Sequence, residues 1–218
     1  DNTTDGGGWN VRLCHIIQTG HYGYPSLFKN FNEEIVQPLA DYGGGSPCGS
    51  VFLDESILPK DYATALYTCD WGRSVVYRHP LTANGAGFVA KQENFVEMPR
   101  PVDMDIDGLG RIFICSWKDG GFNFSKPEVG FVIRVVSNDA KPAPFPDLKK
   151  AGDEQLVEHI GSGSHVLRQY AQRELLRRGE KPAFAAGLEK LAASDKPLAA
   201  RVAAIFTLKQ LLGTKSHD

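Results

Sequence analysis

Trp71 and Arg73 place an aromatic ring and a guanidinium close together, directly after an apolar run that ends at Asp70. A guanidinium can bind a carboxylate or a phosphate through two parallel hydrogen bonds. The flat indole offers a surface on which a sugar or a cofactor ring can stack. Trp117 recurs in a similar context. These residue types indicate a site for an anionic or cyclic ligand, and a structural role for both tryptophans is the alternative.

Further polar side chains could complete such a site. Arg100 adds a second guanidinium, and Asp103 adds a carboxylate three residues later. Asp41 opens a loop with three consecutive glycines at residues 43–45. Consecutive glycines lower stability unless the backbone must approach another group closely or adopt positive φ. We therefore expect this loop to approach either a ligand or another part of the chain.

Two N-terminal segments also carry candidate groups. His21 could accept a proton near neutral pH, beside Tyr22 and Tyr24. The alternative is a surface histidine between two packing tyrosines. Asp1 and Asp5 lie in a glycine-rich segment whose oxygen ligands could hold a hard cation such as Ca²⁺. A solvated turn is the alternative there.

A repeat in the sequence predicts the elements that position these residues. Cys69 and Cys115 are 46 residues apart, and so are Trp71 and Trp117. A recurrence of about 40 to 50 residues, each with several short strands, is typical of β-propeller blades. We therefore expect a mainly β propeller fragment of about two to three blades of four-stranded antiparallel sheet over residues 1–140. The polar ends of neighbouring blades should then converge.

The expected strands are aromatic and β-branched runs bounded by Gly, Asp and Asn. A blade end covers 1–48, and the following blades cover 49–98 and 99–138. Their strands are expected at 50–53, 65–71, 74–79 and 88–96, and then at 102–106, 111–117 and 130–136. Asp107 and Gly108 form a hairpin turn. Because packed sheets lie about 10 Å apart, the mid-strand cysteines Cys69 and Cys115 should be free thiols.

A proline-rich linker at 141–147 precedes a change of period. From residue 148 to 218, apolar residues recur at helical spacing, with helices expected at 153–160, 164–178, 183–192 and 196–212. Ser164 and Asp195 suit N-caps. Gly179 and Gly213 suit C-terminal stops.

Two of these helices align with each other. Arg168 and Arg201 are 33 residues apart, and a small Ala follows each at the same spacing, Ala171 and Ala204. Paired helices at this repeat length predict an all-α, HEAT-like solenoid.

Composition excludes several classes of function. The chain holds 24 Lys and Arg against 26 Asp and Glu and has no basic block, so nucleic acid is not an expected partner. No Ser-His-Asp order, P-loop or Rossmann glycine pattern occurs, and no run is long enough to span a membrane. We expect the chain to be an internal segment of a longer protein, because it opens directly into a glycine-rich loop without an initiating Met.

The segments 21–25, 41–49 and 66–73, together with nearly all of the remaining chain, resemble the large membrane-bound dehydrogenases of planctomycetes and related bacteria. The resemblance implies a six-bladed, glucose/sorbosone-dehydrogenase-like propeller followed by HEAT-like repeats. A c-type cytochrome domain would lie beyond this chain.

The similarity of that group to pyrroloquinoline-quinone (PQQ) sugar dehydrogenases implies a set of site residues. The resemblance assigns the quinone to Tyr22, Tyr24, Arg100 and Asp103, with Arg73 as a substitute for the Lys that would reach the quinone. From their residue types, we expect substrate to bind His21, Asp41, Asp70, Trp71 and Trp117. The catalytic His would lie upstream of Asp1. The chain departs from the pattern at three positions, because Trp9, Gly72 and Val102 stand where an Asp, a Lys and an Arg are expected.

The expected reaction is oxidation of a carbohydrate or alcohol, with PQQ and Ca²⁺ as cofactors. Electrons would pass to a c-type haem outside this chain. The location would be periplasmic or extracellular, and the 218 residues alone would be inactive. The alternative is a non-catalytic propeller and HEAT module that binds polysaccharide or a protein partner, and the three departures favour it.

Overall fold

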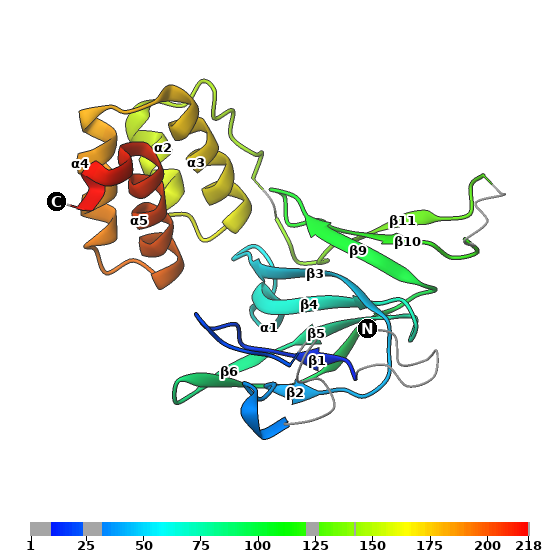
Figure 1. The fold of residues 1–218 in the computed structure, drawn as a ribbon. Coiled ribbons are helices and arrows are strands. Elements are labelled where there is room, and N and C mark those ends of the chain that lie inside the picture. Colours follow the sequence, from blue (N-terminus) through cyan, green and yellow to red (C-terminus); the bar gives the residue numbers. More distant parts are fainter. Residues whose placement is uncertain (1–9, 24–31, 121–126, 142, 218) are drawn as a thin grey trace. The chain divides into compact units, whose positions relative to one another are not determined.

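The computed structural model describes residues 10–23, 32–120, 127–141 and 143–217 (Figure 1). The chain divides into two compact units. Unit 1 comprises residues 1–52, 65–105 and 112–135, and unit 2 comprises residues 53–64, 106–111 and 136–218. Each unit is described separately below.

Unit 1 contains small sheets of two to four strands, and its described residues form no closed barrel. One sheet has the order β3-β4-β5-β8, a second has the order β11-β10-β9, and the pairs β1-β2 and β6-β7 form two-stranded sheets. The strands are β1 (Arg12–Leu13), β2 (Ala40–Asp41), β3 (Pro47–Asp54), β4 (Thr64–Asp70), β5 (Val75–His79), β6 (Leu81–Asn84), β7 (Gly87–Ala90), β8 (Glu93–Glu97), β9 (Pro101–Ile106), β10 (Ile112–Ser116) and β11 (Phe131–Val135). A short 3-10 helix, η2, covers Asn32–Glu34.

The alternation of side chains along β4 explains the first sheet. Tyr67 and Cys69 are fully buried, while Leu66 and Thr68, which alternate with them, are only partly buried. β4 pairs antiparallel with β5, so that Cys69 lies opposite Val76. β10 pairs antiparallel with β11, and there Cys115 lies opposite Val132. The 46-residue repeat therefore corresponds to equivalent strands in two different sheets.

Most of the expected strands are confirmed, and one is wrong. The run 88–96 is divided between two elements, because Gly87–Ala90 turns back onto β6 and only Glu93–Glu97 pairs with β5. Gly85 explains the difference: it has φ +58° at the first of two loop residues between Asn84 and Gly87. A glycine in this conformation favours a tight hairpin.

Strands from the two larger sheets lie against each other. The Cys48 thiol on β3 donates to the Pro101 carbonyl on β9 at 3.1 Å. A Cβ atom added at Gly49 would lie 2.5 Å from the Asp103 Cα and 2.7 Å from the Val102 carbonyl oxygen. Glycine at position 49 therefore permits this close approach of two backbones.

Replacing Gly49 by Ala is expected to lower the free energy of unfolding by about 1–3 kcal/mol, because the added methyl group meets backbone atoms that cannot move aside. Urea denaturation followed by tryptophan fluorescence measures the change. Ser50→Ala, at an exposed neighbouring position, is the matched control. Equal stabilities of the two variants would contradict the close approach of β3 and β9.

Helices make up most of unit 2. They are α1 (Lys60–Ala63), α2 (Asp153–Ile160), α3 (His165–Arg178), α4 (Pro182–Ala192) and α5 (Leu198–Leu212), followed by the 3-10 helix η3 (Gly213–His217). The four helices α2, α3, α4 and α5 share a buried apolar cluster. Among its members are Leu156, Ile160, Ala171, Leu175, Phe184, Leu188 and Ala204. No helix in the described part of the chain is both long and apolar enough to cross a membrane.

The four long helices confirm the helices expected from the sequence, except at one cap. The Ser164 side chain accepts a hydrogen bond from Leu167 N, as expected of an N-cap. Gly179 and Gly213 are C-caps with φ +79° and +59°. Asp195 is not an N-cap, because α5 begins at Leu198 after Pro197. Proline disfavours helical geometry in the residue before it, which excludes an earlier start.

The residues that align between α3 and α5 have matching roles. Ala171 and Ala204 are both fully buried in the helical core. Arg168 donates through Nη1 to the Ser162 carbonyl, and Arg201 donates through Nε to the Ala192 carbonyl. Each arginine thus binds a backbone carbonyl that precedes its own helix. The domain boundaries expected from the sequence stay predictions, and residues 53–64 and 106–111 group with the helices.

Candidate functional site

Three aromatic and cationic side chains meet where strands of the two larger sheets end. Trp71 follows β4 and Trp117 follows β10, and their ring centroids are 6.0 Å apart at an interplanar angle of 47°. The Arg100 guanidinium carbon lies 4.8 Å from the centroid of the Trp71 ring. This tryptophan cluster, Trp71, Trp117 and Arg100, confirms that the two repeated segments converge.

Arg100 is fixed by the turn that follows β10. Its Nη1 donates to the Gly120 carbonyl at 3.0 Å, and its own carbonyl accepts from Trp117 N at 3.0 Å. Arg100 has φ +44°, a strained conformation for a non-glycine residue. Such strain persists only where the surroundings hold it, and it is concentrated at functional sites. The arginine is therefore held in place before any ligand arrives.

Asp70 joins the glycine-rich loop to the end of β4. Its side chain is 2% exposed, and Oδ1 accepts from Ser46 N at 2.9 Å and from Arg73 N at 3.0 Å. A Cβ atom at Gly45 would lie 2.4 Å from the Asp70 Oδ2. The expected close approach of this loop is confirmed, and the group that it approaches is Asp70.

Arg73 lies next to this junction and is exposed. Its Nη2 donates to the Tyr42 carbonyl at 2.6 Å. One nitrogen of the Arg73 guanidinium is thus bound to the backbone of the glycine-rich loop, and this hydrogen bond fixes the orientation of the guanidinium. Arg73 and Arg100 both belong to unit 1, and each is anchored through a backbone carbonyl.

Two buried polar atoms lie in this region without a hydrogen-bond partner among the described residues. They are the indole Nε1 of Trp71 and the hydroxyl oxygen of Ser46. A buried donor without a partner costs about 1–3 kcal/mol, so native proteins supply one, often a water molecule or a ligand. The two atoms therefore mark where the polar groups of a ligand can bind.

Within the described part of the chain, the structure does not bring the other expected site residues into contact with the tryptophan cluster. The Tyr22 hydroxyl accepts from Ile17 N and donates to the His15 carbonyl, so it holds its own loop. His21 is exposed, and its Nδ1 accepts from Gly23 N. Tyr24, Asp1 and Asp5 lie outside the described residues.

Asp41 and Asp103 make local contacts. Asp41 accepts from Gly43 N at 2.9 Å and lies 3.5 Å from Arg12 Nε. Partial burial alone would raise the pKa of Asp41, but the hydrogen bonds from Gly43 and Asn10 and the Arg12 charge lower it below its usual value. The Asp103 carboxylate accepts from Met104 N. Neither of these bonds reaches the tryptophan cluster.

Nothing along the sequence singles out His79, which is the most buried imidazole among the described residues of this region. It is 2% exposed, with Nε2 2.8 Å from the Thr68 hydroxyl and Nδ1 3.2 Å from the Tyr42 hydroxyl. A small pocket of about 90 Å³ lies beside it, lined also by Asp70 and Tyr77. Because Tyr42 also accepts from Arg73, His79 positions the loop that directs this arginine. The sequence of β5, which contains His79, does not predict this contact with Tyr42, because Tyr42 lies outside that strand.

Burial lowers the pKa of His79 below its ordinary value of 6.5, although a backbone contact with Lys91 opposes the shift. Between the folded and unfolded pKa values the unfolded chain binds more protons. The protonation of His79 therefore costs no stability above pH 6.5. Below that pH, the free energy of unfolding decreases as the pH falls toward and through the folded pKa of His79. His79→Gln is expected to flatten this decrease in urea titrations at several pH values. His21→Gln should keep the slope; a slope unchanged in His79→Gln would contradict the assignment.

Two of the cysteines, Cys48 and Cys69, have thiols of low reactivity. All four are free thiols, as expected for Cys69 and Cys115. Burial raises the pKa of Cys69 to about 12, and burial also raises the pKa of Cys48. Because the thiolate is the reactive form, these two thiols stay protonated and inert.

The cluster suits one part of the expected cofactor set. Its guanidinium and indole faces are group types that suit a planar polyanion such as PQQ, whose carboxylates need cations and whose rings need a flat surface. Arg73, outside the cluster, carries a second guanidinium. Within residues 10–23, 32–120, 127–141 and 143–217, no group of three or more His, Cys, Asp or Glu side chains could hold a metal ion. The Ca²⁺ ligands expected at Asp1 and Asp5 fall outside these ranges.

Comparisons with known proteins add a likeness to one solved structure. No protein-family model matches the chain, and no curated protein matches it. A solved structure from Thermus thermophilus, an oxidoreductase proposed to be a glucose dehydrogenase, is similar with a TM-score of 0.48 and 16% sequence identity. The match covers 62% of this chain and 39% of that one, so the chain spans well under half of the length of its neighbour.

Proposed function

We propose that unit 1 carries the sugar-binding face of a dehydrogenase-like oxidoreductase. The observation that carries the proposal is the tryptophan cluster, in which two indoles and a stacked guanidinium meet at the ends of strands from two sheets. Indole faces bind the apolar faces of sugar rings, and guanidiniums donate to hydroxyl groups or carboxylates. The unpartnered Nε1 of Trp71 adds a donor at the same place.

The finer proposal is that unit 1 is part of a six-bladed propeller and that unit 2 is a HEAT-like solenoid. Sheets whose strands are neighbours in order, β3-β4-β5 and β9-β10-β11, support the first part. The matching carbonyl contacts of Arg168 and Arg201 support the second. The longer protein would act in the periplasm or outside the cell and pass electrons to a c-type haem.

The residues of this chain would bind and orient the reactants. Arg73 and Arg100 would bind the carboxylates of PQQ, and Trp71 would stack on a ring and exclude water from it. A bound quinone with Ca²⁺ supplies the two-electron acceptor for oxidation of a sugar hydroxyl group. His79, neutral and buried, would keep Tyr42 in place and with it the anchor of Arg73.

The test has two parts. Titration of PQQ into the 218-residue chain with Ca²⁺ should release heat, and the longer protein with PQQ and Ca²⁺ should reduce an artificial electron acceptor when sugars are added. The 218-residue chain alone should show no turnover, since the catalytic His is expected upstream. Absence of both PQQ binding and turnover would exclude the quinoprotein function.

A second candidate is a glycan-binding module without redox chemistry. The observation in its favour is that Trp9, Gly72 and Val102 stand where the quinoproteins have an Asp, a Lys and an Arg. A glycan-binding screen of the intact chain separates the two candidates. Glycan binding without PQQ binding or sugar oxidation would favour the module.

A further inference from the structure

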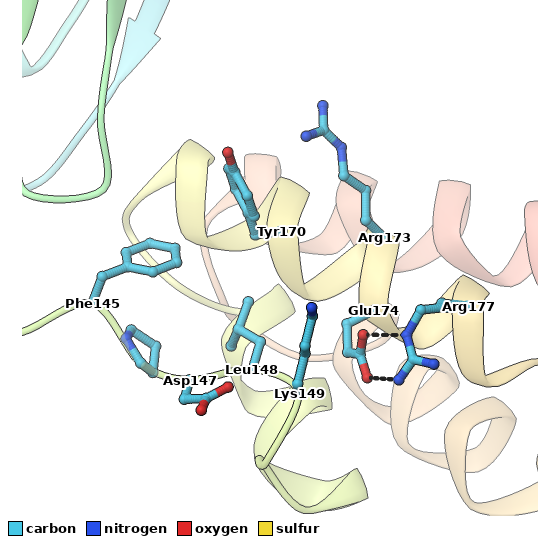
Figure 2. Close-up of a pocket in the computed structure, with 9 residues that line it drawn as sticks. Phe145, Asp147, Leu148, Lys149, Tyr170, Arg173, Glu174 and Arg177 are labelled. Carbon is cyan, nitrogen blue, oxygen red and sulfur yellow. Dashed lines mark hydrogen bonds and ion pairs between the residues drawn. The ribbon is translucent and has the colours of Figure 1, made fainter.

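Unit 2 contains a pocket that is independent of the site in unit 1. It has a volume of about 450 Å³ and lies between residues 145–149 and one face of α3 (Figure 2). This volume is in the range of ligand pockets, which is about 300 to 1,000 Å³. The proposed function gives it no role.

The pocket has an aromatic wall. Phe145 and Tyr170 meet edge to face, with ring centroids 5.6 Å apart at 76°. Tyr170 is 49% exposed, so its ring is accessible to a ligand. Leu148 adds an aliphatic side chain to the lining and lies between Phe145 and Lys149 in Figure 2. An aromatic or large apolar side chain could therefore insert here and be removed from water.

Two cations on the pocket wall lack counter-charges. The Arg173 guanidinium lies 5.2 Å from the Tyr170 ring centroid, and the Lys149 ammonium points toward the pocket in Figure 2. Within the described part of the chain neither side chain has an ion pair. By contrast, Glu174 is 6% exposed and binds Arg177 through two hydrogen bonds of 2.6 and 2.7 Å.

The acidic groups of the pocket are already neutralised. The hydrogen bonds from Arg177 and Arg178 lower the pKa of Glu174 to about 2, so it stays ionised and bound to them. Asp147 lies 3.2 Å from Lys150 Nζ. The uncompensated charge of the pocket is therefore the positive charge of Lys149 and Arg173. An anion that reaches both gains two charge-assisted contacts.

The walls are held in place before binding. Arg178 Nη2 donates to the carbonyls of Leu148, Lys149 and Ala151 at 3.1, 3.2 and 2.9 Å, which attaches this segment to α3. The Phe145 ring lies over Gly108, where an added Cβ atom would clash with it. A preformed pocket avoids the cost of ordering its walls on binding.

We propose that this pocket binds an acidic peptide segment that carries an aromatic or large apolar side chain. The side chain packs against the contacting rings of Phe145 and Tyr170, and flanking carboxylates of the peptide bind Lys149 and Arg173. Tyr170, Arg173 and Arg177 line the pocket at helical spacing along α3, which gives an extended ligand a continuous wall to lie against. The chain from residue 147 onward holds 12 Lys and Arg against 9 Asp and Glu, which suits an acidic partner.

The test uses the intact 218-residue chain and three acetylated, amidated pentapeptides, DEFDE, DEADE and KKFKK. Amide chemical shifts of the ¹⁵N-labelled protein should move in residues 145–149 and in α3 on addition of DEFDE. Binding of DEADE and of KKFKK should be weaker by about tenfold or more, since each lacks one of the two contacts. Raising the salt concentration from about 50 to about 500 mM should also weaken DEFDE binding.

Variants of exposed residues give the matched comparison. Lys149→Ala combined with Arg173→Ala, and separately Tyr170→Ala, should each weaken DEFDE binding by about tenfold. Lys190→Ala removes an exposed cation on α4 that does not line the pocket and has no ion pair with a pocket carboxylate among the described residues, and it should change the affinity by less than about twofold. Far-ultraviolet circular dichroism verifies that the helices are intact in each variant.

Several results would overturn the proposal. Equal affinities for DEFDE and KKFKK would exclude charge recognition, and an equal loss in Lys190→Ala would show that the charge effect is not local. No shift change at about 1 mM peptide would exclude the site. Phenylacetate binding as tightly as DEFDE would identify a site for small organic anions instead. These results are distinguishable from failure of the proposed function, because they involve only unit 2.

Discussion

Replacing Trp71 by Ala is expected to weaken the binding of glycan to the 218-residue chain by about tenfold or more. The change removes a stacking surface worth about 0.5–1.5 kcal/mol and the aromatic partner of Arg100, worth about 0.5–1 kcal/mol. The remaining guanidinium then lacks the ring at 4.8 Å that supports it. Isothermal titration with the best glycan from the binding screen measures the effect.

Trp71→Phe separates two contributions of this side chain. It keeps a flat ring but removes the buried Nε1 that has no partner among the described residues. An intermediate affinity would assign a hydrogen bond to the indole nitrogen. Phe88→Ala, which removes a partly exposed aromatic ring from β7, is the control and should bind normally. If Trp71→Ala bound glycan as tightly as the unchanged chain, the tryptophan cluster would be a packing feature of the converging strands.

Replacing Glu55 by Ala is expected to lower the free energy of unfolding of unit 2 by about 2–4 kcal/mol. Glu55 is 1% exposed, and its Oε1 accepts from Val166 N at 2.9 Å and lies 2.9 Å from His165 Nδ1. The carboxylate thus occupies the N-terminus of α3, where a negative charge is favourable. Its removal leaves the buried Val166 N without this acceptor and removes the partner of His165 at 2.9 Å. Urea denaturation followed by far-ultraviolet circular dichroism measures the loss.

The pH dependence of this contact has a defined sign. Burial opposes the shift, but the hydrogen bonds from His165 and Val166 lower the pKa of Glu55 below its ordinary 4.5. Its contribution to stability is therefore complete above pH 4.5 and is lost as the pH falls through the lower folded value. Glu55→Ala should reduce this acid dependence, whereas Glu154→Ala, at an exposed position on α2, should not. A Glu55→Ala variant as stable as the unchanged chain would contradict the role of this carboxylate.

Local patterns in the sequence were enough to predict most of the elements. Two kinds of pattern could be recognised from the sequence: strand alternation around Cys69 and Cys115, and helical spacing around Ala171 and Ala204. Each depends only on neighbours within one element. The hairpin at Gly85 was missed, although Asn84 and Gly85 form a sequence pair that is typical of a tight hairpin turn. The run 88–96 was interpreted as one strand, whereas it is interrupted at Lys91 and Gln92. Asp195 was a plausible cap, but the backbone restriction imposed by Pro197 moved the start of α5.

The sequence likewise determined one part of the candidate site, and the tertiary structure decided the rest. The spacing of Trp71 and Trp117 by itself determined that two equivalent strand ends exist, because a repeated fold places repeated residues alike. Only the tertiary structure decided that Asp70 binds the glycine-rich loop, that His79 contacts Tyr42, and that Lys149 faces the same pocket as Arg173. These contacts join residues from 24 to 37 positions apart. Packing selects such pairs through shape and charge, and no periodic pattern along the chain records that selection.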